Sequence, residues 1–183
     1  PGMTIISPAD CGEIVKAVHA SALHQGPVYI RLTGTPNNPI VYEEDYDFEI
    51  GKSIQLTEGD DVVIISVGTM VAKAIEASKI LLESGIKAEV VNMHTIKPLD
   101  KDKISLIAES GRPIVTIEEH TLVGGLGSAI LEELSELGKL CPLKMIGLKD
   151  KFGKTAQYNH LLELHGLDAK NLAKSIKTFL SDY

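Results

Sequence analysis

The sequence has 183 residues, of which 44% are hydrophobic and 23% are charged, and its formal net charge is −7. This is the composition of a folded globular chain with enough apolar residues for a sizeable core. Lysine and arginine are not clustered, which argues against a nucleic-acid partner, because phosphate contacts need concentrated positive charge. No apolar run approaches the ~20 residues of a membrane span, so we expect no membrane partner.

The two cysteines and the first residue bear on where this chain comes from. Cys11 and Cys141 are far apart and show no metal-binding spacing. We therefore expect reduced thiols in a cytoplasmic protein. The chain begins with Pro1 rather than methionine, so we expect either processing or an origin in a longer polypeptide.

Residues 1–35 show a strand–helix–strand pattern. An apolar segment at 3–7 leads into a predicted helix with Ser7 as its N-cap and apolar residues at helical spacing, and a second apolar segment follows at 28–32. A unit of this size rarely closes its own core. It either packs on the following domain or is the last βαβ unit of a domain whose front half lies upstream, and we favour the second interpretation.

Residues 36–60 are predicted to be an interdomain connector, because loops of this length are uncommon inside a compact domain. The segment contains two prolines and an acidic, aromatic stretch that includes Asp45 and Asp47. We expect these carboxylates on a solvated face rather than in a ligand site. One short strand is predicted near residues 53–56.

Residues 61–183 alternate between apolar strand segments and amphipathic helical segments. Predicted strands lie at 62–67, 86–93, 113–118 and 143–148. Asp100 and Asp168 are the predicted N-caps of two of the helices. Strands that alternate with helices and short turns predict an α/β fold. We expect a three-layer, open, mostly parallel sheet with helices on both faces.

The glycine-rich turn after the third of these strands is the first candidate site. Gly124, Gly125 and Gly127 open the next helix, and exposed amides at a helix start can bind a phosphate. The spacing is not that of a dinucleotide-binding turn. We favour a structural interpretation, in which the glycines let the helix pack closely on the strand.

Three polar residues near strand ends are further candidates. Glu118 and His120 are two apart and share one side of a strand, so they could form an acid–base pair. A structural pair at a strand end, or a subunit contact, is the interpretation we favour. Arg31 could bind an anion or form a salt bridge. We predict no metal site, because His19 and His24, like His160 and His165, are five residues apart and do not share a helical face.

Several stretches, in order along essentially the whole chain, resemble the C-terminal part of transketolase. They are GPVYIRL (26–32), DVVIISVGTMVAKAIEA (61–77), VVNMHTIKPLD (90–100), IVTIEEHTLVGGLGSAI (114–130) and FGKTAQYNHLLELHGLD (152–168). The TIKPLD and EEH…GGLGSA motifs are shared with other thiamine-diphosphate enzymes. These include deoxyxylulose-phosphate synthase and the beta subunits of 2-oxoacid dehydrogenases.

The resemblance implies part of a transferase that moves a two-carbon ketol unit between sugar phosphates of pentose phosphate metabolism. Residues 1–35 would be the last βαβ unit of the pyrimidine-binding domain, 36–60 the connector and 61–183 the C-terminal domain. The catalytic glutamate and the residues that bind thiamine diphosphate and Mg²⁺ would lie upstream of position 1. We therefore expect no catalytic, cofactor-binding or metal-binding residue here, and an isolated chain that is inactive.

The same resemblance implies a structural role and suggests partners. We expect a homodimer, an N-terminal transketolase section as partner, or both. Family members commonly carry an arginine that clamps the sugar phosphate, and Gly34 stands at that position, which leaves Arg31 as a weaker substrate-binding candidate. The alternatives are a 2-oxoacid dehydrogenase beta subunit, a deoxyxylulose-phosphate synthase, or a non-catalytic assembly module.

Overall fold

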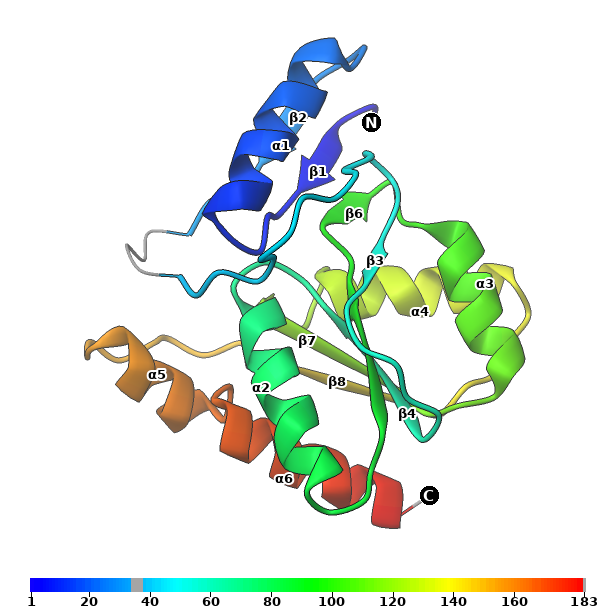
Figure 1. Cartoon of the computed structure of the whole chain (residues 1–183), viewed down its shortest axis with the longest axis vertical. Helices are drawn as coiled ribbons and strands as arrows, with labels where there is room; N and C mark the ends of the chain where they lie inside the picture. Colours follow the sequence, from blue (N-terminus) through cyan, green and yellow to red (C-terminus); the bar gives the residue numbers. More distant parts are fainter. Residues whose placement is uncertain (34–37, 183) are drawn as a thin grey trace.

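The computed structural model describes residues 1–33 and 38–182, and within them the chain forms two sheets (Figure 1). The larger sheet has the strand order β3-β5-β4-β7-β8 and the smaller one the order β2-β1-β6. The larger sheet consists of β3 (Ile54–Gln55), β4 (Val62–Ser66), β5 (Ala88–Asn92), β7 (Ile114–Thr121) and β8 (Leu143–Leu148). Its last four strands are parallel, as predicted, and β3 joins β5 antiparallel at one edge.

Helices cover both faces of the larger sheet, which confirms the predicted three-layer α/β fold. The helices are α2 (Met70–Leu82), α3 (Lys101–Ser110), α4 (Leu126–Glu136), α5 (Tyr158–His165) and α6 (Ala169–Ser181). Val62 and Ile64 of β4 point into a core formed with α2 and α6, whereas Val63 and Ile65 point into a core formed with α3 and α4. A strand buried on both faces is expected to be mainly apolar, and β4 is apolar from Val62 to Ile65, with the buried Ser66 at its end.

The predicted caps of the helices in this region are present. The Asp100 carboxylate accepts the Lys103 N–H at the start of α3, and the Asp168 carboxylate accepts two main-chain N–H groups at the start of α6. Gly111 ends α3 in the left-handed conformation that favours glycine. Among the described residues, no helix has the length and apolar character needed to cross a bilayer.

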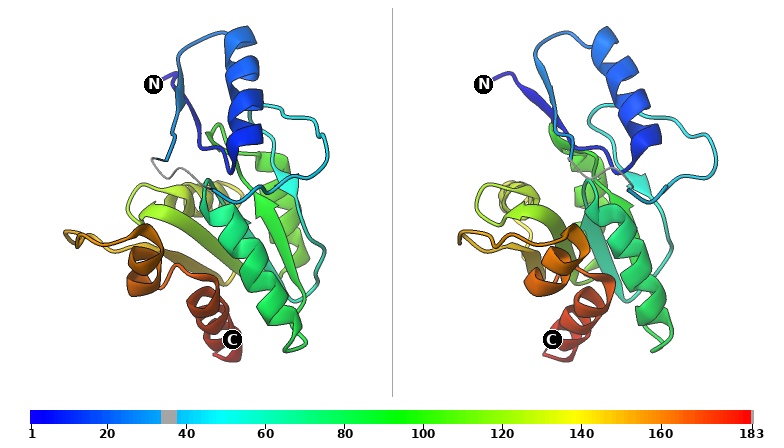
Figure 2. Two further views of the ribbon diagram at one scale, coloured as in Figure 1. Left: turned by 60° about the vertical axis from the view of Figure 1, so that its left-hand side comes forward. Right: turned by 90° about the vertical axis from the view of Figure 1, so that its left-hand side faces the viewer.

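The N-terminal βαβ pattern forms β1 (Thr4–Ile6), α1 (Cys11–Leu23) and β2 (Val28–Ile30), at one end of the molecule (Figure 2). Strands β1 and β2 pair in parallel, with Thr4 opposite Val28. A third strand that the sequence did not predict, β6 (Thr95–Lys97), pairs antiparallel with β1. The chain thus returns, after β5, to extend the N-terminal sheet.

The start of α1 differs from the prediction, because the N-cap is Asp10 and not Ser7. The Ser7 N–H donates to the main-chain oxygen of His94 at 2.8 Å, which holds Ser7 beside the β5–β6 connection. The Asp10 carboxylate accepts the Glu13 N–H at 2.8 Å, and the Glu13 carboxylate accepts the Ala9 N–H at 2.6 Å. These reciprocal bonds resemble a capping box, which lies three residues later in the chain than the predicted cap.

The outer side of α1 is apolar and exposed. Val15, Val18 and Leu23 are 57%, 52% and 88% exposed, whereas the buried residues of this helix are Glu13 and Ala17. Helices of globular proteins ordinarily bury their apolar side. The apolar side that the sequence predicted is therefore present, but no described element covers it.

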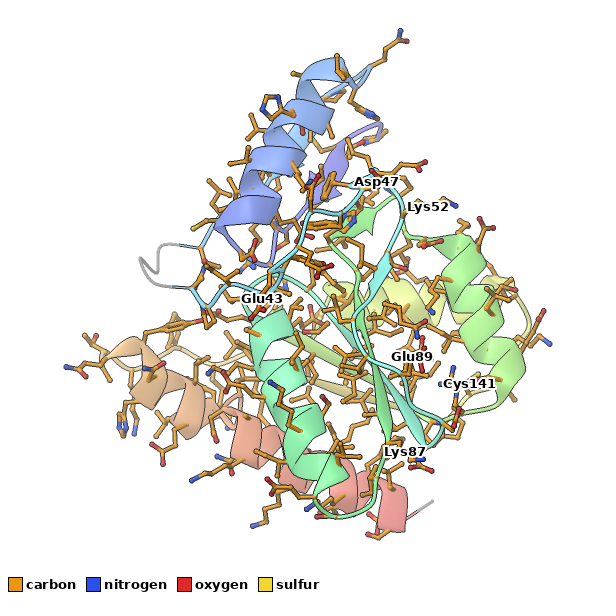
Figure 3. The ribbon with its side chains drawn as sticks, viewed as in Figure 1. Glu43, Asp47, Lys52, Lys87, Glu89 and Cys141 are labelled. Atoms are coloured by element: carbon orange, nitrogen blue, oxygen red, sulfur yellow. The ribbon has the colours of Figure 1, made fainter. Side chains whose placement is uncertain are left out.

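The connector crosses between the two sheets and is held to the start of α1. The Asp10 carboxylate accepts the Val41 N–H at 2.7 Å, and the Lys16 ammonium donates to the main-chain oxygen of Tyr46 at 2.7 Å. Glu43 and Asp47 are exposed (Figure 3). Asp45 is also exposed and pairs with Lys16. The expected solvated acidic face is thus present.

Candidate functional site at the strand ends

The candidate residues gather at the carboxyl ends of β4 and β7, which are neighbours in the larger sheet. The chain leaves β4 through α2 toward one face and leaves β7 through α4 toward the other. Such a switch point is where open α/β sheets tend to bind ligands. Glu118, His120 and the glycine turn lie at the end of β7, and Arg31 reaches the same place from the end of β2.

The Glu118 side chain binds the start of α4. This carboxylate is 1% exposed, and its two oxygens accept the N–H groups of Leu126 and Gly127 at 2.7 and 2.9 Å. Burial raises the pKa of Glu118 above its ordinary value, and the two N–H donors oppose that rise. The amides that could have held a phosphate are therefore bound by the chain's own carboxylate, which stabilises the positive end of the helix.

The glycines of this turn leave room for that carboxylate. A Cβ atom on Gly125 would lie 1.9 Å from Glu118 Oε2, and one on Gly127 would lie 2.8 Å from Met145 and Thr116. Gly124 meets no such contact but has a φ of +73°, a conformation that glycine adopts most readily. These contacts support the interpretation that the turn serves close packing of helix on strand.

His120 is beside Glu118 but has a different main partner. Its Nδ1 lies 2.8 Å from the main-chain oxygen of Thr121 and 4.0 Å from Glu118 Oε2. A carbonyl oxygen can only accept, so the Nδ1 of His120 carries the proton in this contact. With both Glu118 oxygens bound to helix amides, the pair is not arranged for proton transfer, and the geometry supports the structural alternative.

Arg31 ties the N-terminal unit to the end of β7. Its Nη2 donates to the main-chain oxygen of Glu119 at 3.0 Å, and its side chain is half-buried. Among the described residues, no carboxylate lies within 4.0 Å of this guanidinium, so the salt bridge considered as its alternative role is absent there. Gly34, the expected position of the phosphate clamp, lies outside the described residues.

Sequence reasoning missed a second polar cluster at this edge, centred on Glu119. Its Oε2 accepts the hydroxyls of Thr69 at 2.7 Å and Tyr158 at 2.5 Å. Burial, and then the hydrogen bond to Glu119, raise the pKa of Tyr158 to about 12. Strand alternation places Glu119 on the face opposite Glu118. Nothing in the sequence indicated that the start of α5 would reach it.

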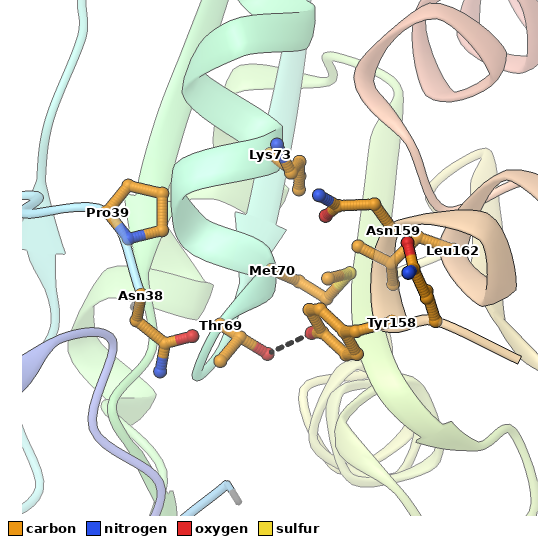
Figure 4. Close-up of a pocket in the computed structure, with 9 residues that line it drawn as sticks. Asn38, Pro39, Thr69, Met70, Lys73, Tyr158, Asn159 and Leu162 are labelled. Atoms are coloured by element: carbon orange, nitrogen blue, oxygen red, sulfur yellow. Dashed lines mark hydrogen bonds between the residues drawn. The ribbon is translucent and has the colours of Figure 1, made fainter. Parts of the chain in front are cut away.

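A cavity of about 340 Å³ opens beside this second cluster (Figure 4). Thr69, Met70 and Lys73 line it from the start of α2, and Tyr158 and Leu162 do so from α5. Lys73 is paired with Glu76 at 2.9 Å, which offsets its charge. The cavity offers hydroxyl and amide groups to a small polar molecule, but it does not bring a nucleophile and a base together.

The described residues hold their histidine, cysteine and carboxylate side chains apart. They contain no group of three or more histidine, cysteine, aspartate or glutamate side chains placed to hold a metal ion. The most suitable anion cradle, at the start of α4, is filled by Glu118.

The chain is similar to a transketolase section and to a related enzyme over nearly its whole length. Residues 51–172 match the family described as the C-terminal domain of transketolase. A putative transketolase C-terminal section of Methanocaldococcus jannaschii is 39% identical over 178 residues, which cover 96% of this chain and 55% of that protein. A 1-deoxy-D-xylulose-5-phosphate synthase of Chlorobium luteolum is 38% identical over 98% of this chain and 29% of its own length.

The fold is also similar to that of a solved protein. A split-gene transketolase, in the form of an inactive β4 tetramer, superposes with a TM-score of 0.92 at 39% identity. The superposition covers 99% of this chain and 59% of the solved one. The present chain thus spans about half the length, or less, of these relatives.

Proposed function

The chain belongs to the transketolase C-terminal domain family, and from this premise we propose that it is the C-terminal portion of a transketolase-type enzyme. That enzyme transfers a two-carbon ketol unit between sugar phosphates. The observation that carries the proposal is the similarity, over 99% of the chain, to a chain of a split-gene transketolase. In this proposal residues 1–35 end the pyrimidine-binding domain, 36–60 are the connector and 61–183 are the C-terminal domain.

The missing front half of the pyrimidine-binding domain is proposed to cover α1. The exposed Val15, Val18 and Leu23 support this, because an apolar helix side of this kind is normally buried. Among the described residues, the outer edge of β2 has no strand partner and offers main-chain groups to a further strand. The covering segment is upstream in the same polypeptide or in an N-terminal transketolase section that binds this chain.

Thiamine diphosphate and Mg²⁺ are proposed to bind outside this chain in the complete enzyme. The cofactor supplies the electron sink for ketol transfer. The contribution of this chain is structural: Glu118 fixes α4 on the sheet, and Arg31 joins the N-terminal unit to β7. The surface around His120 and the glycine turn is a proposed subunit contact.

Self-association is the second part of the structural role. The split-gene transketolase that superposes on this chain forms an inactive β4 tetramer. We propose by analogy that this chain forms a homo-oligomer, a dimer at least, and that it has no activity alone. Reduced Cys11 and Cys141, both free thiols in the structure, support a cytoplasmic location.

Reconstitution tests this proposal. The chain is purified alone and with an N-terminal transketolase section, and both samples receive thiamine diphosphate, Mg²⁺, a ketose phosphate and an aldose phosphate. We expect ketol transfer only in the combined sample, and light scattering should show an oligomer in each. Ketol transfer by the chain alone would contradict the proposal that thiamine diphosphate and Mg²⁺ bind outside this chain. A combined sample that assembles without transferring would favour the assembly-module alternative.

Deoxyxylulose-phosphate synthase is the second candidate, because such an enzyme is 38% identical over nearly the whole chain. The two candidates differ in their donor substrate. The reconstituted sample is therefore also given pyruvate and glyceraldehyde 3-phosphate, and release of carbon dioxide is measured. Carbon dioxide release without ketol transfer would replace the first candidate by the second.

A further inference from the structure

We propose that a basic hollow beside β8 binds the phosphate group of a small phosphorylated molecule. The hollow has a volume of about 440 Å³ and is lined by Lys144, Lys149, Lys174, His165 and Ser175 among other residues, none of them acidic. This volume is within the range of small-molecule sites. The hollow is separate from the switch-point cluster and goes beyond the role proposed above.

The basic residues converge from different elements. Lys144 lies in β8, Lys149 follows that strand, His165 ends α5 and Lys174 lies in α6. Lysines often protect the free edge of a sheet against association, and this would account for Lys144 alone. It does not account for Lys174, which α6 brings to the same hollow.

The three lysines of the hollow lack the acidic partners that some lysines of the chain have, as do further lysines outside the hollow, such as Lys79 and Lys139, among the described residues. Lys16, Lys52, Lys73, Lys101 and Lys103 each have a carboxylate within 4.0 Å. Among the described residues, no carboxylate lies that close to Lys144, Lys149 or Lys174. In a chain of net charge −7, a hollow lined by one sign of charge concentrates oppositely charged ligands.

Uncharged donors complete the hollow. The Ser175 hydroxyl lines it from α6, and β8 is an edge strand whose outer main-chain groups have no strand partner among the described residues. The Lys144 ammonium lies 5.8 Å from the centre of the Phe179 ring, which holds it near α6. Ammonium, hydroxyl and main-chain N–H groups are the donors that bind phosphate oxygens.

The test is a titration of the purified protein with inorganic phosphate, followed by amide NMR shifts at constant ionic strength maintained with sodium chloride. The wild type should show saturable shifts at Gly147 and Ser175. Replacing both Lys144 and Lys174 by alanine should weaken binding by about tenfold or more. A control that replaces Lys79 and Lys139, two exposed lysines elsewhere, should bind as the wild type does.

Three outcomes would overturn the proposal. They are shifts that do not saturate, equal binding by the Lys144/Lys174 variant, and a polyglutamate peptide that shifts the same amides when phosphate does not. The last would mark the hollow as a docking surface for an acidic protein. If the double variant does not fold, Lys174→Gln replaces it, because Lys174 is exposed on α6 and its substitution leaves the core intact.

Discussion

Replacing Gly125 by alanine should uncouple α4 from the sheet. The new Cβ would lie 1.9 Å from Glu118 Oε2 and 2.9 Å from the main-chain oxygen of Thr121, so the carboxylate must move. Moving it breaks the bonds to the Leu126 and Gly127 amides. A hydrogen bond to a buried charged group contributes about 1.5–3 kcal/mol, so we expect a loss of about 3–5 kcal/mol in the free energy of unfolding.

Urea denaturation followed by circular dichroism measures this loss, and the melting temperature should fall by about 10 °C. Gly153→Ala is the matched control, because a Cβ there meets nothing within 4 Å, and it should be neutral. A double-mutant cycle identifies the cause. In a Glu118→Ala background, Gly125→Ala should lower the free energy of unfolding by much less than it does in the wild type. An equal cost in both backgrounds would refute the role of the carboxylate, and a fully stable Gly125→Ala would refute the packing argument.

Two further predictions concern the partly buried Tyr158 and the buried Glu13. Tyr158→Phe removes the hydroxyl that donates to Glu119 and should lower the free energy of unfolding by about 1–2 kcal/mol; exposed Tyr29→Phe is the control, and equal urea midpoints would contradict the prediction. Burial raises the pKa of Glu13 above its ordinary value of 4.5, so its contribution to stability is complete below that pH and is lost as the pH rises through the folded-state pKa. The wild type should therefore become less stable relative to Glu13→Gln as the pH rises above 4.5, and parallel profiles in urea denaturation would rule this out.

The two helix caps and the glycine turn show which local features could be predicted from the sequence. Asp100 and Asp168 cap helices as predicted, because a cap is formed with amides only two or three residues away. The glycine turn after β7 was predicted to serve packing, and its contacts support that. The acceptor at its amides was not identified beforehand, because Glu118 lies eight and nine residues away from them and is brought there by the turn.

By itself, the amino-acid sequence determined the order of strands and helices of the larger sheet and its two buried faces. These follow from apolar periodicity and capping, which act over a few residues. Only the tertiary structure decided that β6 extends the N-terminal sheet, that Asp10 rather than Ser7 caps α1, and that Tyr158 reaches Glu119. Each of these depends on main-chain or side-chain groups from segments distant in the sequence, and local pattern does not encode which distant partner satisfies a polar group.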